Sequence, residues 1–160
     1  MKVRTVVTTC ATLFVGLVVG LTMCFAAAAN PAIGTWKLNE AKSKLTPGFP
    51  KNLTVKYEVV GDQIKATVDG VDGMGKPTHN EWTGKFDGKD YPVTGDPTSD
   101  MRSYKVVDDH TVALTVKKGG KVTITGTIVT SADGKTRTLT AGGTDSMGMK
   151  VEGVSVYDKQ

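Results

Sequence analysis

Apolar residues recur at every second position through much of the chain after residue 50. The clearest run alternates with polar neighbours and comprises Leu53, Val55, Tyr57 and Val59. A period of two places one side-chain face against a core and the other in water, which is typical of antiparallel β-strands. The pattern therefore predicts short strands over most of the chain.

Further segments repeat this alternation, and turn-forming residues separate them. They run from Ile64 to Val68, Asn80 to Phe86, Tyr104 to Val106, Val112 to Val116, Val122 to Ile128, Arg137 to Leu139 and Val151 to Tyr157. Hairpin chemistry is present at Asp108-Asp109, Gly119-Gly120 and Asp133-Gly134. About eight to ten antiparallel strands joined by short turns predict an all-β fold, a single antiparallel up-and-down β-barrel. An open sandwich is the alternative.

The first 29 residues differ in kind from the rest. A basic start with Lys2 and Arg4 precedes an apolar run, which ends in four alanines at residues 26–29. This order is that of a secretory signal peptide, because signal peptidase requires small residues next to the bond that it cuts. We expect cleavage within two residues of Ala29, a barrel domain over residues 30–160, and a secreted or periplasmic protein.

Two alternatives to a cleaved signal peptide stay open. The apolar segment from Val6 to Phe25 is nearly long enough to span a bilayer if it is not cleaved. Leu21 to Cys24 also has the outline of a lipoprotein signal, although Met23 stands where a small residue is usual. Both cysteines, Cys10 and Cys24, lie in this segment, so cleavage would leave no disulfide and no thiolate metal site.

Composition narrows the functional classes. The 160 residues, 39% of them hydrophobic, suit one domain with a single core. The net charge is +4, and it falls to +2 without Lys2 and Arg4. A nucleic-acid interface needs an excess of clustered basic residues, whereas these lysines are scattered. We therefore expect no nucleic-acid partner.

The segment Gly34-Thr35-Trp36 resembles the Gly-x-Trp motif that opens the first strand of lipocalins and related calycin barrels. The wider run from Gly34 to Leu38 is also similar to the opening of intracellular fatty-acid-binding proteins. As a whole, the chain most resembles small, secreted bacterial lipocalin-like proteins. The resemblance implies a lipocalin-like barrel in which Gly34 and Trp36 are structural, with Trp36 filling the closed end.

Motifs for catalysis or metal binding are incomplete. Residues 70–76 have the letters of a phosphate-binding loop, but Pro77 replaces the required Ser or Thr. His79 and Glu81 would share an outward face, which supplies too few ligands for a structural metal site. His110 follows a turn in which carboxylates commonly accept hydrogen bonds from backbone amides. We expect no enzyme activity, no cofactor and no metal.

The arginines are the most informative polar residues. Apart from Arg4, the chain has only Arg102 and Arg137, against sixteen lysines after Lys2. Strand parity places Arg102 on the face of Tyr104 and Arg137 on the face of Leu139, which is the barrel interior. A guanidinium in an apolar cavity suits a carboxylate, as in fatty-acid-binding proteins. The plainer alternative, favoured by Asp100-Met101 directly before Arg102, is that both arginines lie at strand ends and extend to water.

The predicted function is binding of a small hydrophobic or amphipathic molecule, with a carboxylate as one option. The expected ligand-binding residues are Tyr57, Trp82, Phe86, Arg102, Tyr104 and Arg137, with Met74 and Met147 in loops near the entrance. Inward Gly84, Gly126 and Ala66 favour space inside the barrel. The alternative function is a protein-binding module, such as a protease inhibitor or envelope assembly factor, with a solid barrel and a protein partner.

Overall fold

The computed structural model describes residues 30–144 and 148–160. The expected signal peptide, with Cys10 and Cys24, lies outside the described residues, and so does Met147. Within the described part of the chain, no helix has the length and apolar character needed to cross a membrane.

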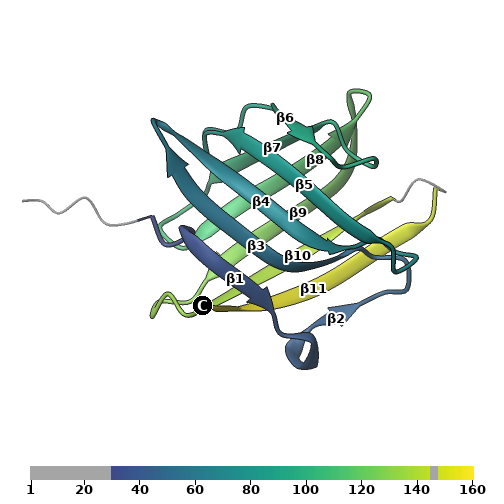
Figure 1. Cartoon of the computed structure of the whole chain (residues 1–160), viewed down its shortest axis with the longest axis horizontal. Helices are drawn as coiled ribbons and strands as arrows, with labels where there is room; N and C mark the ends of the chain where they lie inside the picture. The colour runs from purple at the N-terminus through teal and green to yellow at the C-terminus, as the bar shows by residue number, and fades with distance from the viewer. Residues whose placement is uncertain (1–29, 145–147) are drawn as a thin grey trace, which may run out of the picture.

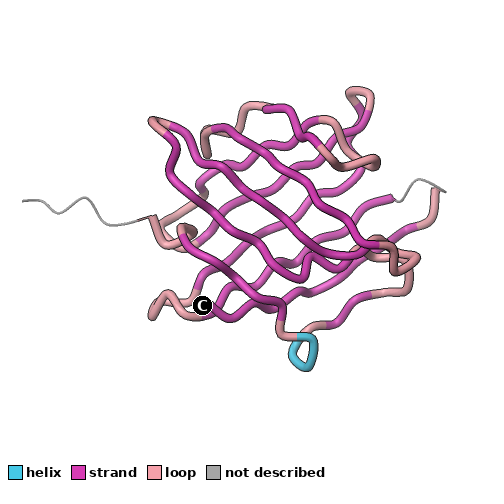
Figure 2. The backbone as a smooth tube through the Cα atoms, in the orientation of Figure 1, coloured by secondary structure: helices cyan, strands magenta, loops and turns pink. Residues whose placement is uncertain are grey.

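The described residues form a closed antiparallel β-barrel with almost no helix (Figure 1, Figure 2). Ten of the eleven strands follow one another around the wall, and β1 pairs with β11 to close it. The remaining strand, β2, pairs with β11 only among the described strands. This confirms the predicted barrel, and the open sandwich is wrong. The strands are β1 (Gly34–Leu38), β2 (Lys44–Leu45), β3 (Lys51–Val60), β4 (Gln63–Val71), β5 (Pro77–Gly84), β6 (Tyr91–Thr94), β7 (Met101–Val106), β8 (Thr111–Lys118), β9 (Lys121–Thr130), β10 (Thr136–Thr144) and β11 (Lys150–Lys159).

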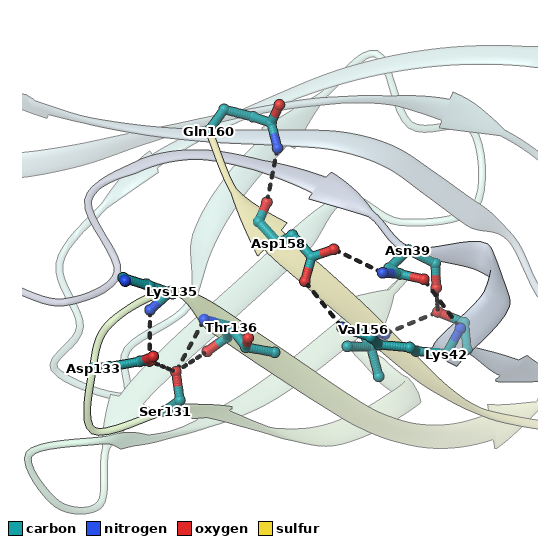
Figure 3. A network of polar contacts seen from close by, with 10 residues as sticks. Asn39, Lys42, Ser131, Asp133, Lys135, Thr136, Val156, Asp158 and Gln160 are labelled. Carbon is teal, nitrogen blue, oxygen red and sulfur yellow. Dashed lines mark hydrogen bonds and ion pairs between the residues drawn. The ribbon is translucent and has the colours of Figure 1, made fainter.

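The seam of the barrel lies along β11 (Figure 1). β1 pairs with the C-terminal half of β11, and β2 pairs with its N-terminal half, so a short 3-10 helix, η1 (Glu40–Lys42), separates two partners of one strand. The side-chain amide of Asn39 donates to Asp158 Oδ2 at 2.7 Å, and Lys42 lies 3.7 Å from the same carboxylate (Figure 3). These polar contacts fasten the first strand to the last.

Four aromatic side chains pack against one another inside the barrel. The rings of Tyr57, Trp82, Phe86 and Tyr104 form pairs with centroids 4.7–6.3 Å apart, mostly in edge-on or tilted arrangements. A side chain at Gly84 would overlap the rings of Tyr91 and Trp82. The expectation of interior space at Gly84 was therefore wrong, because neighbouring rings occupy that space.

The same is true of the other small inward positions. Ala66 is completely buried in the core, and a side chain at Gly126 would meet β10 at Thr140 and Ala141. These residues permit close approach of strands and rings instead of lining a cavity.

Local irregularities account for the other differences from the predicted strands. Leu53 is 37% exposed because the pairing of β3 with β4 shifts register between Asn52 and Thr54. Phe86 lies beyond the end of β5, in the loop before β6, instead of within a strand. The short strands β2 and β6 lack an alternating pattern long enough to be recognised in the sequence.

Candidate functional site

Both arginines that follow the first 29 residues point into the barrel. Arg102 on β7 is 8% exposed and Arg137 on β10 is 3% exposed. Their predicted inward parity is confirmed, and the alternative in which both extend to water is wrong. Arg102 is the second residue of β7, and Arg137 is the second residue of β10. Because these two strands begin at opposite rims, the two arginines lie toward opposite ends of the barrel.

Arg102 has its own counter-charge. Its Nη2 lies 3.6 Å from Asp96 Oδ2, in the loop between β6 and β7, and donates to Asn80 Oδ1 at 3.3 Å. The indole of Trp82 donates to the backbone carbonyl of Arg102 at 2.9 Å, which fixes this part of β7 against β5. The guanidinium of Arg102 is therefore neutralised within the fold.

Asp96 is built to remain a carboxylate. Burial alone would raise its pKa, but hydrogen bonds from Ser99 and Thr98, together with the charge of Arg102, hold the pKa below its ordinary value. Ser99 Oγ donates to Asp96 Oδ2 at 2.6 Å, and Thr98 donates to Oδ1 through both its amide and its hydroxyl. The loop thus presents a fixed negative charge to Arg102.

Arg137 is surrounded by aromatic rings. Its guanidinium carbon lies 4.7 Å from the ring centre of Tyr57 and 5.7 Å from those of Trp36 and Tyr157. Its Nη2 donates to the Tyr57 hydroxyl at 3.0 Å. Such cation–π contacts partly replace the hydration that the cation loses on burial.

The turn between β9 and β10 directly precedes Arg137. In this turn, Ser131 Oγ donates to Asp133 Oδ1 at 2.6 Å and accepts from the amide of Thr136 at 2.9 Å (Figure 3). Gly134 supplies the positive φ of 68° that the turn needs. This hydrogen-bonded turn sets the register of β10, and the register directs residue 137 inward.

Arg137 has no acidic partner within residues 30–144 and 148–160. No carboxylate of these residues lies within 4.0 Å of its guanidinium, whereas Arg102 has Asp96. Its Nε is buried without a hydrogen-bond acceptor, and Nη1 donates to no described residue either. A buried guanidinium in this state can bind an anion without first breaking an internal ion pair.

A pocket of about 480 Å³ opens beside Arg137 at one end of the barrel, which we call the Arg137 pocket. Its lining residues are Asn30, Pro31, Ala32, Tyr57, Phe86, Val106, Asp108, Asp109, His110, Val112, Ile128, Thr130 and Arg137. The walls are thus mainly apolar. The buried polar residues of the pocket are Arg137, Tyr57 and Thr130, and its exposed polar residues are Asn30 and those of the β7–β8 turn.

The start of the barrel domain contributes to the wall of this pocket. The indole of Trp36 donates to the carbonyl of Ala32 at 2.8 Å, and the side chain of Asn30 accepts from the amide of Ala32. Gly34 has a φ of 124°, which residues with side chains rarely adopt, and a side chain there would have to displace the end of the Lys159 side chain. The Gly-x-Trp segment therefore holds residues 30–32 beside Arg137.

Two further aromatic residues predicted for the site lie behind the pocket. Trp82 and Tyr104 are buried in the aromatic cluster and do not line the pocket, although the Tyr104 hydroxyl lies 3.5 Å from that of Tyr57. Burial and the neighbouring Tyr57 raise the pKa of Tyr104, so it stays neutral. Trp82 packs against the lining residue Phe86, and Tyr104 packs against the lining residues Tyr57 and Phe86.

The structure thus divides the predicted ligand-binding residues. Tyr57, Phe86 and Arg137 meet in one pocket, whereas Arg102 lies toward the other end with Asp96. Met74 is 90% exposed in the β4–β5 turn, at the end away from the Arg137 pocket. The ligand-binding role of each of these residues stays a prediction.

Sequence reasoning missed the acidic groups at both ends. It did not assign Asp96 to Arg102, because the two residues meet only through a loop that bends back onto β7. It interpreted Asp108 and Asp109 as turn residues, and it gave no sign that this turn borders the Arg137 pocket. The only available signal was that Asp108 and Asp109 directly follow the strand that carries Arg102 and Tyr104.

Other surface features offer less chemistry. A groove of about 640 Å³ runs along the outer wall beside β2, with Thr125, Thr140, Gly142 and Glu152 among its lining residues. His79 does not pair with Glu81 as a ligand set but lies 2.7 Å from Asp69. No group of three or more potential metal ligands occurs within the described residues.

The comparisons with known proteins assign no family to this chain. No protein-family model and no curated protein matches the chain. Among solved structures, the chain is similar to a redesigned β-barrel, mFAP1, bound to DFHBI, with 16% sequence identity and a TM-score of 0.44. The match covers 82% of this chain and 98% of the other. The lipocalin resemblance stays a prediction, while the closed antiparallel barrel that it implies is confirmed.

Proposed function

We propose that this protein is a non-enzymatic, exported binding protein for a small amphipathic ligand whose acidic group pairs with Arg137. One observation supports this proposal above the others. Arg137 is buried beside a pocket, and no described carboxylate neutralises it. The signal-like pattern of residues 1–29 supports export.

The chemistry of Arg137 favours a carboxylate as the acidic group. A guanidinium offers parallel N–H donors that match the two oxygens of a carboxylate. Tyr57 already holds Nη2, so the side chain is oriented before a ligand arrives. Pre-orientation of this kind reduces the conformational entropy that the side chain loses on binding.

The remainder of the pocket suits an apolar tail. Phe86, Val106, Val112 and Ile128 line it, and a volume near 480 Å³ falls in the range of about 300–1,000 Å³ that is typical of small-molecule sites. The packed aromatic cluster behind Tyr57 limits how far a ligand can enter. We therefore expect a short or medium-length ligand near one end of the barrel, not one that fills the interior.

The first test is a comparison of head groups. We would purify the protein without detergent, extract it with organic solvent, and identify any stoichiometric acid by mass spectrometry. The stripped protein would then be titrated with dodecanoate and with dodecanol, which share a tail and differ in charge. Fluorescence of the buried Trp36, which contacts Arg137, would report binding. We expect dodecanoate to bind roughly ten- to a hundredfold more tightly, since hydrogen bonds to charged groups contribute roughly 1.5–3 kcal/mol.

Two pairs of variants control this test. Arg137→Met should abolish the preference for the acid, whereas Arg102→Lys should retain it because residue 102 lies outside the pocket. Tyr57→Phe should weaken binding of dodecanoate. Tyr104→Phe should leave that binding unchanged, because the Tyr104 hydroxyl does not line the pocket. Equal binding of acid and alcohol, or a preference that survives Arg137→Met in a folded protein, would refute the proposal.

A protein-binding module is the second candidate, and one observation favours it. Aromatic rings pack closely against one another inside the barrel, and Met74 is almost fully exposed at the end away from the pocket. A flexible thioether at a loop tip suits an adaptable contact with a protein. Suppose that the purified protein carries no ligand and binds neither dodecanoate nor dodecanol. If it then binds a protein partner, and Met74→Ser abolishes that binding, the protein-binding module replaces the carrier proposal.

A further inference from the structure

The Arg137 pocket carries charges of both signs. Arg137 is buried in its depth, and Asp108 and Asp109 lie on the exposed β7–β8 turn that also lines it. Arg137 and His110 are the only basic side chains among the lining residues. A simple fatty acid would satisfy the inner charge but leave the end of its tail beside two carboxylates.

The carboxylates of Asp108 and Asp109, at the rim of the Arg137 pocket, differ in their contacts with the rest of the protein. Asp108 Oδ1 accepts from the amide of His110 at 2.9 Å, and hydrogen bonds from His110 and Thr111 hold its pKa below the ordinary value. Asp109 makes no hydrogen bond or ion pair with a described residue. Asp108 is therefore a fixed negative charge that also shapes the turn, and Asp109 is a free one.

The buried cation and the acidic rim point to one class of ligand. The inner group requires a negative charge, because Arg137 Nε has no acceptor and no described carboxylate compensates the guanidinium. The rim repels a second negative charge and attracts a positive one. The apolar residues Val106, Val112 and Ile128 lie on the same wall and suit a hydrocarbon spacer.

We infer that the natural ligand is a bipolar amphipath, with an acidic group at one end, an apolar spacer, and an amino or other cationic group at the other end. This inference rests on the proposed function, since it assumes that the acidic group binds Arg137. It adds the prediction that Asp109, with Asp108, selects the second charge.

The test uses matched acids that differ only at the tail end. Medium-chain fatty acids would be compared with ω-amino acids of the same chain lengths, over a series of lengths, by fluorescence titration of the purified protein at low salt. At the best length, we expect the ω-amino acid to bind about two- to fivefold more tightly, because exposed ion pairs contribute little more than this. Added salt should remove the advantage.

Asp109→Asn is the informative variant, because Asp109 has no structural partner to lose. It should remove the advantage of the ω-amino acid and leave fatty-acid binding unchanged or slightly stronger. Asp62→Asn is the control: it removes the same charge from the exposed β3–β4 turn, at the same end but outside the pocket lining, and loses only an exposed ion pair with Lys85. It should leave the advantage intact.

The failures of the two proposals can be distinguished. If fatty acids bind through Arg137 but the ω-amino acids gain nothing at any length, only the inference about the second charge is overturned. An advantage that persists in Asp109→Asn, or an equal change for both acids, also overturns it. If neither series depends on Arg137, the proposed function fails and this inference fails with it.

Discussion

The two ends of the barrel solve the burial of an arginine in different ways. At one end, Arg102 pairs with Asp96 and Asn80, so its charge is compensated inside the protein. At the other end, the described residues that contact the Arg137 guanidinium are aromatic rings and the Tyr57 hydroxyl, and Arg137 borders a pocket. The same side chain with the same inward parity thus belongs to the structure in one case and to a candidate binding site in the other.

The largest expected effect comes from removing the charge that compensates Arg102. Asp96→Asn should lower the free energy of unfolding by about 2–3 kcal/mol, since it leaves a nearly buried guanidinium without its counter-charge. Urea denaturation would measure the change, with Asp62→Asn as a control that loses only an exposed ion pair with Lys85. An unaltered midpoint would show that Arg102 does not depend on Asp96, and the contrast between the two ends would disappear.

Replacing the arginines themselves sharpens the contrast. Arg102→Met should cost about 2 kcal/mol because it leaves Asp96 without its cationic partner. Arg137→Met should change stability by about 1 kcal/mol or less, since lost cation–π contacts are offset by relief of desolvation. The two variants would be compared by urea denaturation under identical conditions. A larger loss for Arg137→Met would assign that residue to the structure instead of the site.

The tyrosine hydroxyls offer a smaller test at the Arg137 end. Tyr57→Phe should lower the free energy of unfolding by about 1 kcal/mol, because Arg137 Nη2 loses its acceptor. Tyr104→Phe should cost less, since its hydroxyl lies 3.5 Å from that of Tyr57, which is a long hydrogen bond. Thermal and urea unfolding of both variants would measure this. The reverse order would mean that Tyr104 and not Tyr57 organises the cluster.

The smallest expected effect is in the pH dependence of stability. The pKa of Asp96 in the folded state lies below its ordinary value of 3.8, so its contribution is present above that pH and is lost as the pH falls through the folded pKa. Stability should decline in acid, and Asp96→Asn should decline less steeply than the unaltered protein. Urea midpoints measured over a series of acidic pH values would show it. Parallel curves would contradict the prediction.

Much of the fold follows from alternation and turn chemistry. The period-two runs identified the long strands, and Asp133-Gly134 and Gly119-Gly120 identified hairpins that the structure contains. Strand parity alone predicted that Arg102 and Arg137 face inward. These features were accessible because they depend only on neighbours in sequence.

The rest depends on contacts between distant residues. Whether the space at Gly84 is empty or filled depends on Tyr91, which reaches it from the next strand. Which arginine is neutralised depends on Asp96, whose loop bends onto β7. The extent of the pocket depends on residues 30–32, whose position is set by Trp36. No periodicity encodes any of these contacts.

The closure of the barrel along β11 has a consequence for the order of folding. Asn39 and Asp158 are separated by 119 residues, and the seam that they fasten can form only when the last strand is present. Long-range pairings of this kind form slowly, because loop-closure entropy opposes them until many contacts form together. Trp36 comes from the first strand and Tyr157 from the last, so the ring of aromatic groups around Arg137 is completed only at this late step. A chain that stops before β11 would expose two unpaired strand edges and lack the Tyr157 ring that packs against Arg137.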